Sequence, residues 1–247
     1  MCTVSAALAA DGASLRIVVN RDERRLRMQA RPPERFAPYG VPAIWPVDQE
    51  AGGTWAAVTA HGLAFALLNV SAPGWKRTGL DPEWVTRGAV IPYLAASADI
   101  VDVERRFVSG PARWPCRPFK LLVASIDRLV LLTPMGSSDL DTPVVLSTSS
   151  LGDELVEGPR RTLFADLLAS SATAWQAQDR LHQHAWPDRR HVSALMRRAD
   201  ACTVSRTEMV LGRESVEMRY AALCDGWPAG IAATPKRLAR LRSAAAA

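Results

Sequence analysis

The second residue of the chain is a cysteine, Cys2, which follows Met1. Aminopeptidases remove an initial methionine when the next side chain is small, so we expect Cys2 to become the terminal residue. A terminal cysteine combines a thiol whose reference pKa is about 8.5 with an α-amine whose pKa is about 7.7–8.0. The amine can take the proton of its own thiol, directly or through a water molecule, so no histidine is required. Cys2 is therefore the candidate nucleophile.

A polar cluster, Asn20–Glu23, follows an apolar run and can lie beside Cys2 if the two segments form a hairpin. In that position Asp22 can anchor the α-amine, and Arg21 can bind an anionic substrate group or favour the thiolate. Asn69 ends a later apolar run and can donate a hydrogen bond to an oxyanion. The expected catalytic residues are thus Cys2, Asp22 and Asn69.

The composition narrows the class of protein. The formal net charge is +5, but the basic residues are mostly arginines interleaved with acids, which is typical of a solvated surface, so we expect no nucleic-acid partner. The cysteines lack CxxC spacing, and no export signal or membrane span is recognisable, so we expect a soluble cytoplasmic protein with reduced thiols. His182 and His184 face apart on a predicted helix, so no metal site is expected. The sequence sets no oligomeric state.

Apolar segments joined by short turns predict antiparallel hairpins. The strand pairs are expected within residues 2–20, 52–69, 119–134 and 202–223. Helical patterns cover Trp84–Ala96, Pro159–Ala169, Thr173–His184 and Arg189–Ala199. The Pro- and Arg-rich segment 21–53 is expected to be a long surface loop, and residues 236–247 a frayed, basic, Ala-rich tail.

Hairpins at both ends of the chain, with helices clustered between them, do not suit a parallel sheet with crossover helices. They favour an α+β sandwich of antiparallel sheets. We expect one domain over residues 1–247.

Six motifs in order along the chain resemble the NRDE family, which is also called transport and Golgi organisation protein 2-like. They are NRDE at 20–23, GGTW at 52–55, GLAFALLN at 62–69, TRG at 86–88, LSTSSLGD at 146–153 and CTVSRTEMVL at 202–211. The resemblance spans nearly the whole chain, and the ordered set is far more specific than any one motif.

The resemblance implies the N-terminal nucleophile hydrolase fold, a four-layer αββα sandwich of two mainly antiparallel sheets flanked by helices. The more distant conjugated bile salt hydrolases and penicillin V acylases share this fold and a Met-Cys start. At the position of their conserved arginine this chain has Val19, and at that of their second polar asparagine it has Thr148. We expect Asn20, Arg21, Arg87 and Thr148 to contact substrate, with Arg87 binding an anion.

Two functions remain open at this point. The first is a cysteine N-terminal nucleophile amidohydrolase that acts on a small amide or acyl compound and requires no cofactor. The second is a non-catalytic protein that binds and moves haem, acyl-CoA or lipid, as the resemblance to the NRDE family implies. An apolar pocket rimmed by Arg21 and Arg87 would suit such an amphipathic anion.

Overall fold

The computed structural model describes residues 2–71, 86–110, 116–224 and 227–241. The N-terminal strand lies inside an antiparallel sheet whose strand order is β10-β1-β2-β11-β12-β13. Its strands are β1 (Cys2–Leu8), β2 (Ser14–Arg24), β10 (Val144–Thr148), β11 (Ala201–Gly212), β12 (Ser215–Cys224) and β13 (Trp227–Ala239). The turn at residues 9–13 joins β1 to β2, as the Asp11-Gly12 pair predicts.

The second sheet is also antiparallel and follows the chain order from β3 to β9. Its strands are β3 (Arg31–Phe36), β4 (Ala43–Val47), β5 (Ala56–Thr59), β6 (Ala64–Asn69), β7 (Phe119–Ala124), β8 (Leu129–Thr133) and β9 (Gly136–Leu140). The predicted hairpins β5–β6 and β7–β8 are confirmed.

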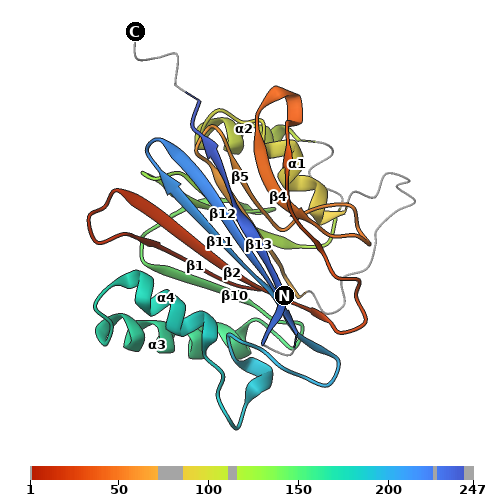
Figure 1. Cartoon of the computed structure of the whole chain (residues 1–247), viewed down its shortest axis with the longest axis vertical. Helices are drawn as coiled ribbons and strands as arrows, with labels where there is room; N and C mark the ends of the chain where they lie inside the picture. Colours follow the sequence, from red (N-terminus) through yellow and green to blue (C-terminus); the bar gives the residue numbers. More distant parts are fainter. Residues whose placement is uncertain (1, 72–85, 111–115, 225–226, 242–247) are drawn as a thin grey trace.

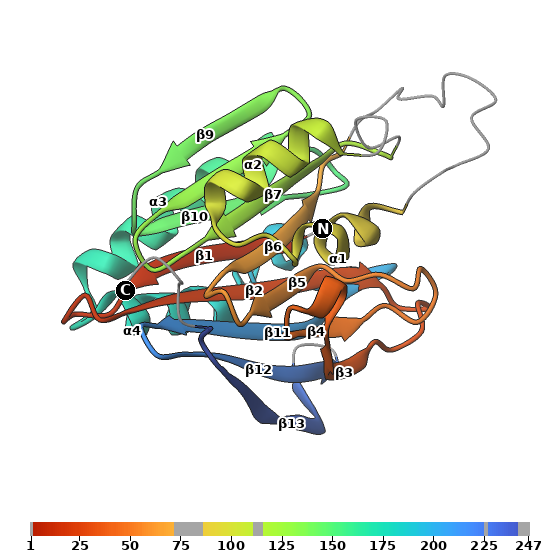
Figure 2. The same cartoon turned by 90° about the horizontal axis from the view of Figure 1, so that it is seen from above.

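Helices cover the outer face of each sheet. On the first sheet, α3 (Glu154–Ala169) packs on β10, and α4 (Ala174–Gln183) packs on β1 and β2. On the second sheet, α1 (Val90–Leu94) and α2 (Ile100–Ser109) share a hydrophobic cluster with the strands. Figure 1 shows the two helix pairs on opposite sides of the sheets. Figure 2 shows β1, β2, β11, β12 and β13 of the first sheet side by side. This four-layer αββα arrangement confirms the expected fold class.

The alternation of side chains along β1 decides what each residue can reach. Cys2, Val4 and Ala6 point into the hydrophobic core between the two sheets. Thr3 and Ser5 point to the other side and hydrogen-bond side chains of α3 and α4. The candidate nucleophile therefore belongs to the face between the sheets.

The prediction of a long loop at residues 21–53 is wrong, because β2 continues to Arg24 and the segment also contains β3 and β4. Strand β3 is a sheet edge, where prolines are tolerated because half of the backbone groups need no strand partner. Pro46 of β4 lies opposite an irregularity in the β3–β4 register and beyond the residues that pair with β5. Neither strand follows the alternating pattern of an ordinary hairpin.

Helices α3 and α4 confirm the patterns at 159–169 and 173–184, although α3 begins earlier, at Glu154. The helix expected at 84–96 is reduced to a 3₁₀ turn at Arg87–Ala89 followed by α1, and Trp84 lies outside the described residues. The helix expected at 189–199 is wrong, since only Arg190–Val192 form a 3₁₀ turn.

The segment that follows Val192 is extended because its backbone groups bond to other elements. The carbonyl oxygens of Val192 and Ser193 accept hydrogen bonds from Arg160, and Met196 N donates to Thr203 Oγ1. The expected tail at 236–247 is also corrected at its start, because β13 continues to Ala239 and Leu238 is buried. Residues 242–247 lie outside the described residues.

Candidate active site

Cys2 lines a cavity of about 300 Å³ at the end of β1, together with Arg21, Asp22, Asn69 and Arg87. The structure therefore brings together five of the seven residues that the sequence suggested for the site. The neighbours are set by the sheet, because antiparallel pairing puts the first residue of β1 opposite Arg21 of β2.

The Cys2 side chain is 3% exposed, although it borders the cavity. Its backbone N–H donates to Thr148 Oγ1 over 3.3 Å, and the two residues are partners in the β1–β10 register. Burial raises the pKa of the Cys2 thiol above its ordinary value, and the Asp22 carboxylate acts in the same direction. The thiol is therefore neutral at pH 7 and needs a base before it can attack.

Asp22 is almost completely buried and accepts a hydrogen bond of 2.6 Å from the Thr203 hydroxyl. Burial raises the pKa of the Asp22 carboxyl, while the Arg160 guanidinium opposes this shift. Asp22 lines the same cavity as Cys2, and its role as an anchor for an ammonium group stays a prediction.

The Arg21 side chain forms part of the cavity wall, but its charge is already compensated. Its Nη2 atom donates to Asp48 Oδ2 over 2.7 Å, and its guanidinium lies 4.3 Å from the ring centre of Trp55. Arg27 binds the same carboxylate, and the pKa of Asp48 is lowered because backbone and arginine groups offset its burial. Arg21 is therefore better suited to fixing the wall than to binding an anion.

Asn69 is the last residue of β6, so its side chain is at the sheet end that faces the cavity. Arg87 reaches the same cavity from the turn before α1. That turn is held against the strand entry by backbone contact: Thr54 N donates to Gly88 O, and a Cβ atom on Gly53 would lie 2.5 Å from Gly88 backbone atoms. The GGTW and TRG motifs are thus two sides of one contact.

Two predicted contact residues are corrected. Asn20 points to the helix layer, where its Nδ2 donates to the carbonyl oxygens of His182 and Ala194, because alternation puts it on the face opposite Arg21. Thr148 is buried and is absent from the residues that line the cavity, and its hydroxyl binds the backbone of Cys2 instead. Both residues instead make hydrogen bonds that hold the strands at Cys2, the candidate nucleophile.

The sequence analysis missed Arg160, which is 1% exposed and projects from α3. The buried face of this helix contains Val156, Arg160, Phe164 and Leu167, so a single cation lies within an apolar stripe. That interruption of the stripe was the available signal. Burial lowers the pKa of the Arg160 guanidinium, and this shift is opposed by the Asp22 carboxylate and by Cys2 when its thiol is ionised.

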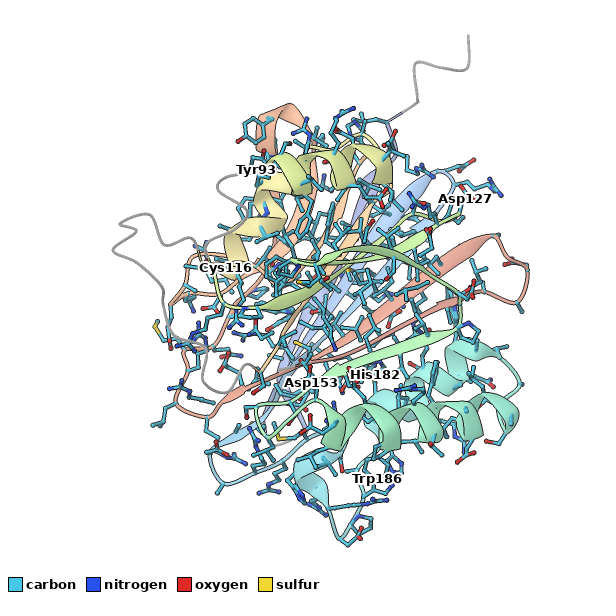
Figure 3. The ribbon with its side chains drawn as sticks, turned by 180° about the vertical axis from the view of Figure 1, so that it is seen from behind. Tyr93, Cys116, Asp127, Asp153, His182 and Trp186 are labelled. Carbon is cyan, nitrogen blue, oxygen red and sulfur yellow. The ribbon has the colours of Figure 1, made fainter. Side chains whose placement is uncertain are left out.

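Arg160 belongs to a buried polar layer between α3, α4 and the first sheet. In this layer His182 is hydrogen-bonded through Nε2 to Ser5 Oγ at 2.9 Å, and Gln178 donates to the same oxygen. Figure 3 shows His182 between the helices and the sheet. These side chains contact β1 on the face of the sheet opposite the cavity.

In the described part of the chain, no group of three or more His, Cys, Asp or Glu side chains is arranged to hold a metal ion. Over the same residues, no helix is both long and apolar enough to span a bilayer.

Solved structures with the same architecture define the class of fold. Penicillin V acylase from Agrobacterium tumefaciens is 11% identical and has a TM-score of 0.57, and the match covers 96% of this chain and 91% of the acylase. The conjugated bile acid hydrolase from Clostridium perfringens is 11% identical and has a TM-score of 0.53, and the match covers 90% of this chain and 89% of the hydrolase. The N-acylethanolamine-hydrolyzing acid amidase orthologue of Caenorhabditis elegans is 12% identical, with 84% and 92% covered and a TM-score of 0.52. The chain has the N-terminal nucleophile hydrolase fold.

The family is shown by sequence. The model of the Transport and Golgi organisation 2 family matches residues 1–208, and the chain belongs to that family. This confirms the resemblance that the six motifs indicated. A comparison with curated proteins finds no match.

Proposed function

We propose that the protein is a cysteine N-terminal nucleophile hydrolase that cleaves the C–N bond of a small amide. The observation that carries the proposal is the convergence of Cys2, Asp22 and Asn69 on one cavity at the end of β1. The solved structures with this fold include an acylase, a bile acid hydrolase and an acid amidase, which makes amide cleavage the natural reaction class to test.

Removal of Met1 would leave the α-amine on Cys2. The Cys2 sulfur would then attack the carbonyl carbon while the amine accepts the thiol proton. Asn69 Nδ2 would donate a hydrogen bond to the oxyanion that forms. When the C–N bond breaks, the proton passes from the α-ammonium to the leaving amine, and the acyl group remains on sulfur as a thioester. Water then cleaves the C–S bond, and the sulfur recovers a proton.

Asp22 has a supporting role in this scheme. Its carboxylate would hold the α-ammonium in the orientation that allows proton transfer, and the Arg160 cation opposes the rise in the pKa of Asp22 that burial causes. The raised pKa of the Cys2 thiol fits a nucleophile that is activated only when its own amine and a substrate are in place.

The test combines mass spectrometry with a panel of N-acyl amides. The mature N-terminus should begin at Cys2 in protein made in a cell, and substrate should leave an acyl adduct on the peptide that carries Cys2. Cys2→Ala should abolish turnover, whereas the matched Cys116→Ala variant, which changes a half-buried thiol that does not line the cavity, should retain it. Retention of Met1, or unchanged turnover by Cys2→Ala, would contradict the proposal.

The second candidate function is binding and transport of haem, acyl-CoA or a lipid without hydrolysis, in a cytoplasmic setting that suits free thiols. Arg87 and Arg117 of the cavity favour it, since neither is in a described ion pair and arginine suits an anionic ligand. Titrations with haem and with acyl-CoA, followed by absorbance and calorimetry, test this function. Saturable binding without turnover would support it, and no saturable binding of either compound would contradict it.

A further inference from the structure

The cavity that holds Cys2 is one end of a longer cleft. A second cavity of about 510 Å³ adjoins it, and the two share Asn69, Arg87 and Arg117 along with the end of β2. The combined cleft therefore runs from the nucleophile past Arg87 and Arg117 to the region around Asp200. A substrate bound at Cys2 has room to extend in that direction.

The charges along the cleft are unequal. Six arginines and four acidic residues line the two cavities, so the cleft is cationic overall. On one wall the acids compensate the arginines: Arg21 and Arg27 bind Asp48 at 2.7 and 2.9 Å. At the far end Arg198 pairs with Asp200 at 3.4 Å. Of the other three arginines, Arg24 is exposed at the end of β2. The remaining two lie between these two regions.

Arg87 and Arg117 occupy that middle region. Within the described residues neither has a carboxylate within ion-pair distance, and Arg87 donates to a backbone carbonyl, Pro118 O, at 3.1 Å. Burial lowers the pKa of Arg87, and the nearby Arg117 cation lowers it further. Two guanidinium groups thus line the same two cavities beside the candidate nucleophile, and an anion between them would offset the repulsion of like charges.

We propose that Arg87 and Arg117 form an anion-binding subsite and that the substrate is an amide or acyl compound bearing a carboxylate or phosphate group. The subsite rests on the proposed function, because the anion it binds is part of the molecule that Cys2 attacks. Arginine suits this task, since its planar fork binds both oxyanions through paired hydrogen bonds.

The experiment compares the alkylation of Cys2 by an anionic and a neutral reagent. Iodoacetate and iodoacetamide modify the same sulfur, and mass spectrometry of the peptide that carries Cys2 distinguishes this reaction from modification of Cys116. The iodoacetamide rate reports the reactivity of the thiol and so bears on the proposed function. The ratio of the iodoacetate rate to the iodoacetamide rate reports the attraction of an anion to the cleft.

The ratio in the unmodified protein should exceed that of a free cysteine compound in the same buffer. The double variant Arg87→Gln/Arg117→Gln should lower the ratio by about tenfold, and added salt should also lower it. Arg161→Gln removes an exposed arginine from α3 and should change the ratio by less than about twofold. An unchanged ratio in the double variant, with a normal iodoacetamide rate, would overturn the subsite.

Calorimetric titration covers the case in which Cys2 does not react at all. N-acetylglycine supplies a carboxylate, and inorganic phosphate supplies the other anion. Saturable binding of either one that the double variant loses would support the subsite even if the hydrolase proposal fails, and the preferred anion would identify the group on the substrate. Equal binding by both proteins, or no binding of either anion, would overturn the subsite.

Discussion

The Nη1 atom of Arg160 donates a hydrogen bond of 2.8 Å to Thr3 Oγ1, on the residue next to Cys2. The other two hydrogen bonds of this guanidinium go to the carbonyl oxygens of Val192 and Ser193. A buried cation thus has neutral hydrogen-bond partners, while the acidic groups whose charge it feels are those of the candidate site. Arg160 is a positioning residue that acts on the site through Thr3 and through the electric field.

Arg160→Met should lower the free energy of unfolding by about 3 kcal/mol or more, because it leaves three buried acceptors unsatisfied and removes the cation that acts on Asp22. Arg161→Met, one position along α3 and exposed, should change it by less than about 0.5 kcal/mol. Urea denaturation measures both. Equal effects of the two substitutions would contradict the assigned role.

Arg160→Lys tests the electrostatic part of this role, because the variant keeps the charge. It should retain more of the Cys2 alkylation rate at a fixed pH than Arg160→Met does, and the pH profile of Arg160→Met should move upward as the thiolate loses a nearby cation. Identical pH profiles for all three proteins would restrict Arg160 to structural support.

Gly53→Ala should disrupt the cleft, since the added Cβ would meet backbone atoms of Gly88 at 2.5 Å and force apart the two segments that place Arg87. We expect a loss of stability by about 2 kcal/mol or more and a lower iodoacetate preference at Cys2. Gly158→Ala is the control: its Cβ meets nothing within 4 Å, and alanine in helix α3 should add about 0.5–1 kcal/mol. Thermal unfolding should separate the two variants, and a Gly53→Ala protein as stable as the parent would refute the contact.

His182 should make stability depend on pH. Burial lowers its pKa well below the ordinary value, and the cations Arg206, Arg16 and Arg160 add to the effect. The unfolded chain binds a proton below about pH 6.5 and the folded one does not, so this contribution is present above pH 6.5 and is lost as the pH falls, by up to about 1.4 kcal/mol per pH unit.

Urea denaturation between pH 7.5 and 5 measures this slope. His182→Gln should flatten the slope, because the variant keeps a polar group near Ser5 but removes the titrating ring. His191→Gln, which removes an exposed histidine, is the matched control. A slope that is the same in the parent and in His182→Gln would show that other groups cause it.

The Cys2 thiol should react slowly at neutral pH when a residue precedes it, and its alkylation rate should rise about tenfold per pH unit toward its raised pKa. Cys116, whose pKa burial raises to about 11, provides an internal comparison (Figure 3). A mature chain with a free α-amine should react faster at pH 7 than a chain extended by two residues before Cys2. Equal rates would mean that the amine does not assist the thiol.

Much of the first sheet and of the site could be predicted from the sequence, because local signals determine it. The Asp11-Gly12 turn aligns β1 with β2 and brings Cys2 opposite Arg21. Asn69 ends an apolar strand with a clear turn before it, at His61-Gly62. Hairpins carry their own register, so residues at strand ends can be placed without knowledge of distant contacts.

Features that depend on contacts distant in sequence could not be predicted. Thr148 lies beside Cys2 because β10 returns to the edge of the first sheet after all seven strands of the second sheet, β3 to β9. Asn20 was assigned to substrate because it belongs to a polar cluster, although strict alternation along β2 sends it to the opposite face from Arg21. Arg160 reaches Thr3 only because α3 packs on the first sheet, a contact that the local sequence does not predict.

The position of β1 between β2 and β10 also determines when, during synthesis, the strand can acquire both of its neighbours. Cys2 and its neighbour Thr148 are separated by 146 positions, so a ribosome adding about 5–20 residues per second takes about 7–30 s between them. During that interval β1 has only β2 to pair with, and a residue preceding Cys2 is open to an aminopeptidase. Once β10 has joined the sheet, the backbone of Cys2 is held on both sides. Under the proposed function, removal of the residue before Cys2 therefore competes with the pairing of β10 and β1 while the chain is still being synthesised.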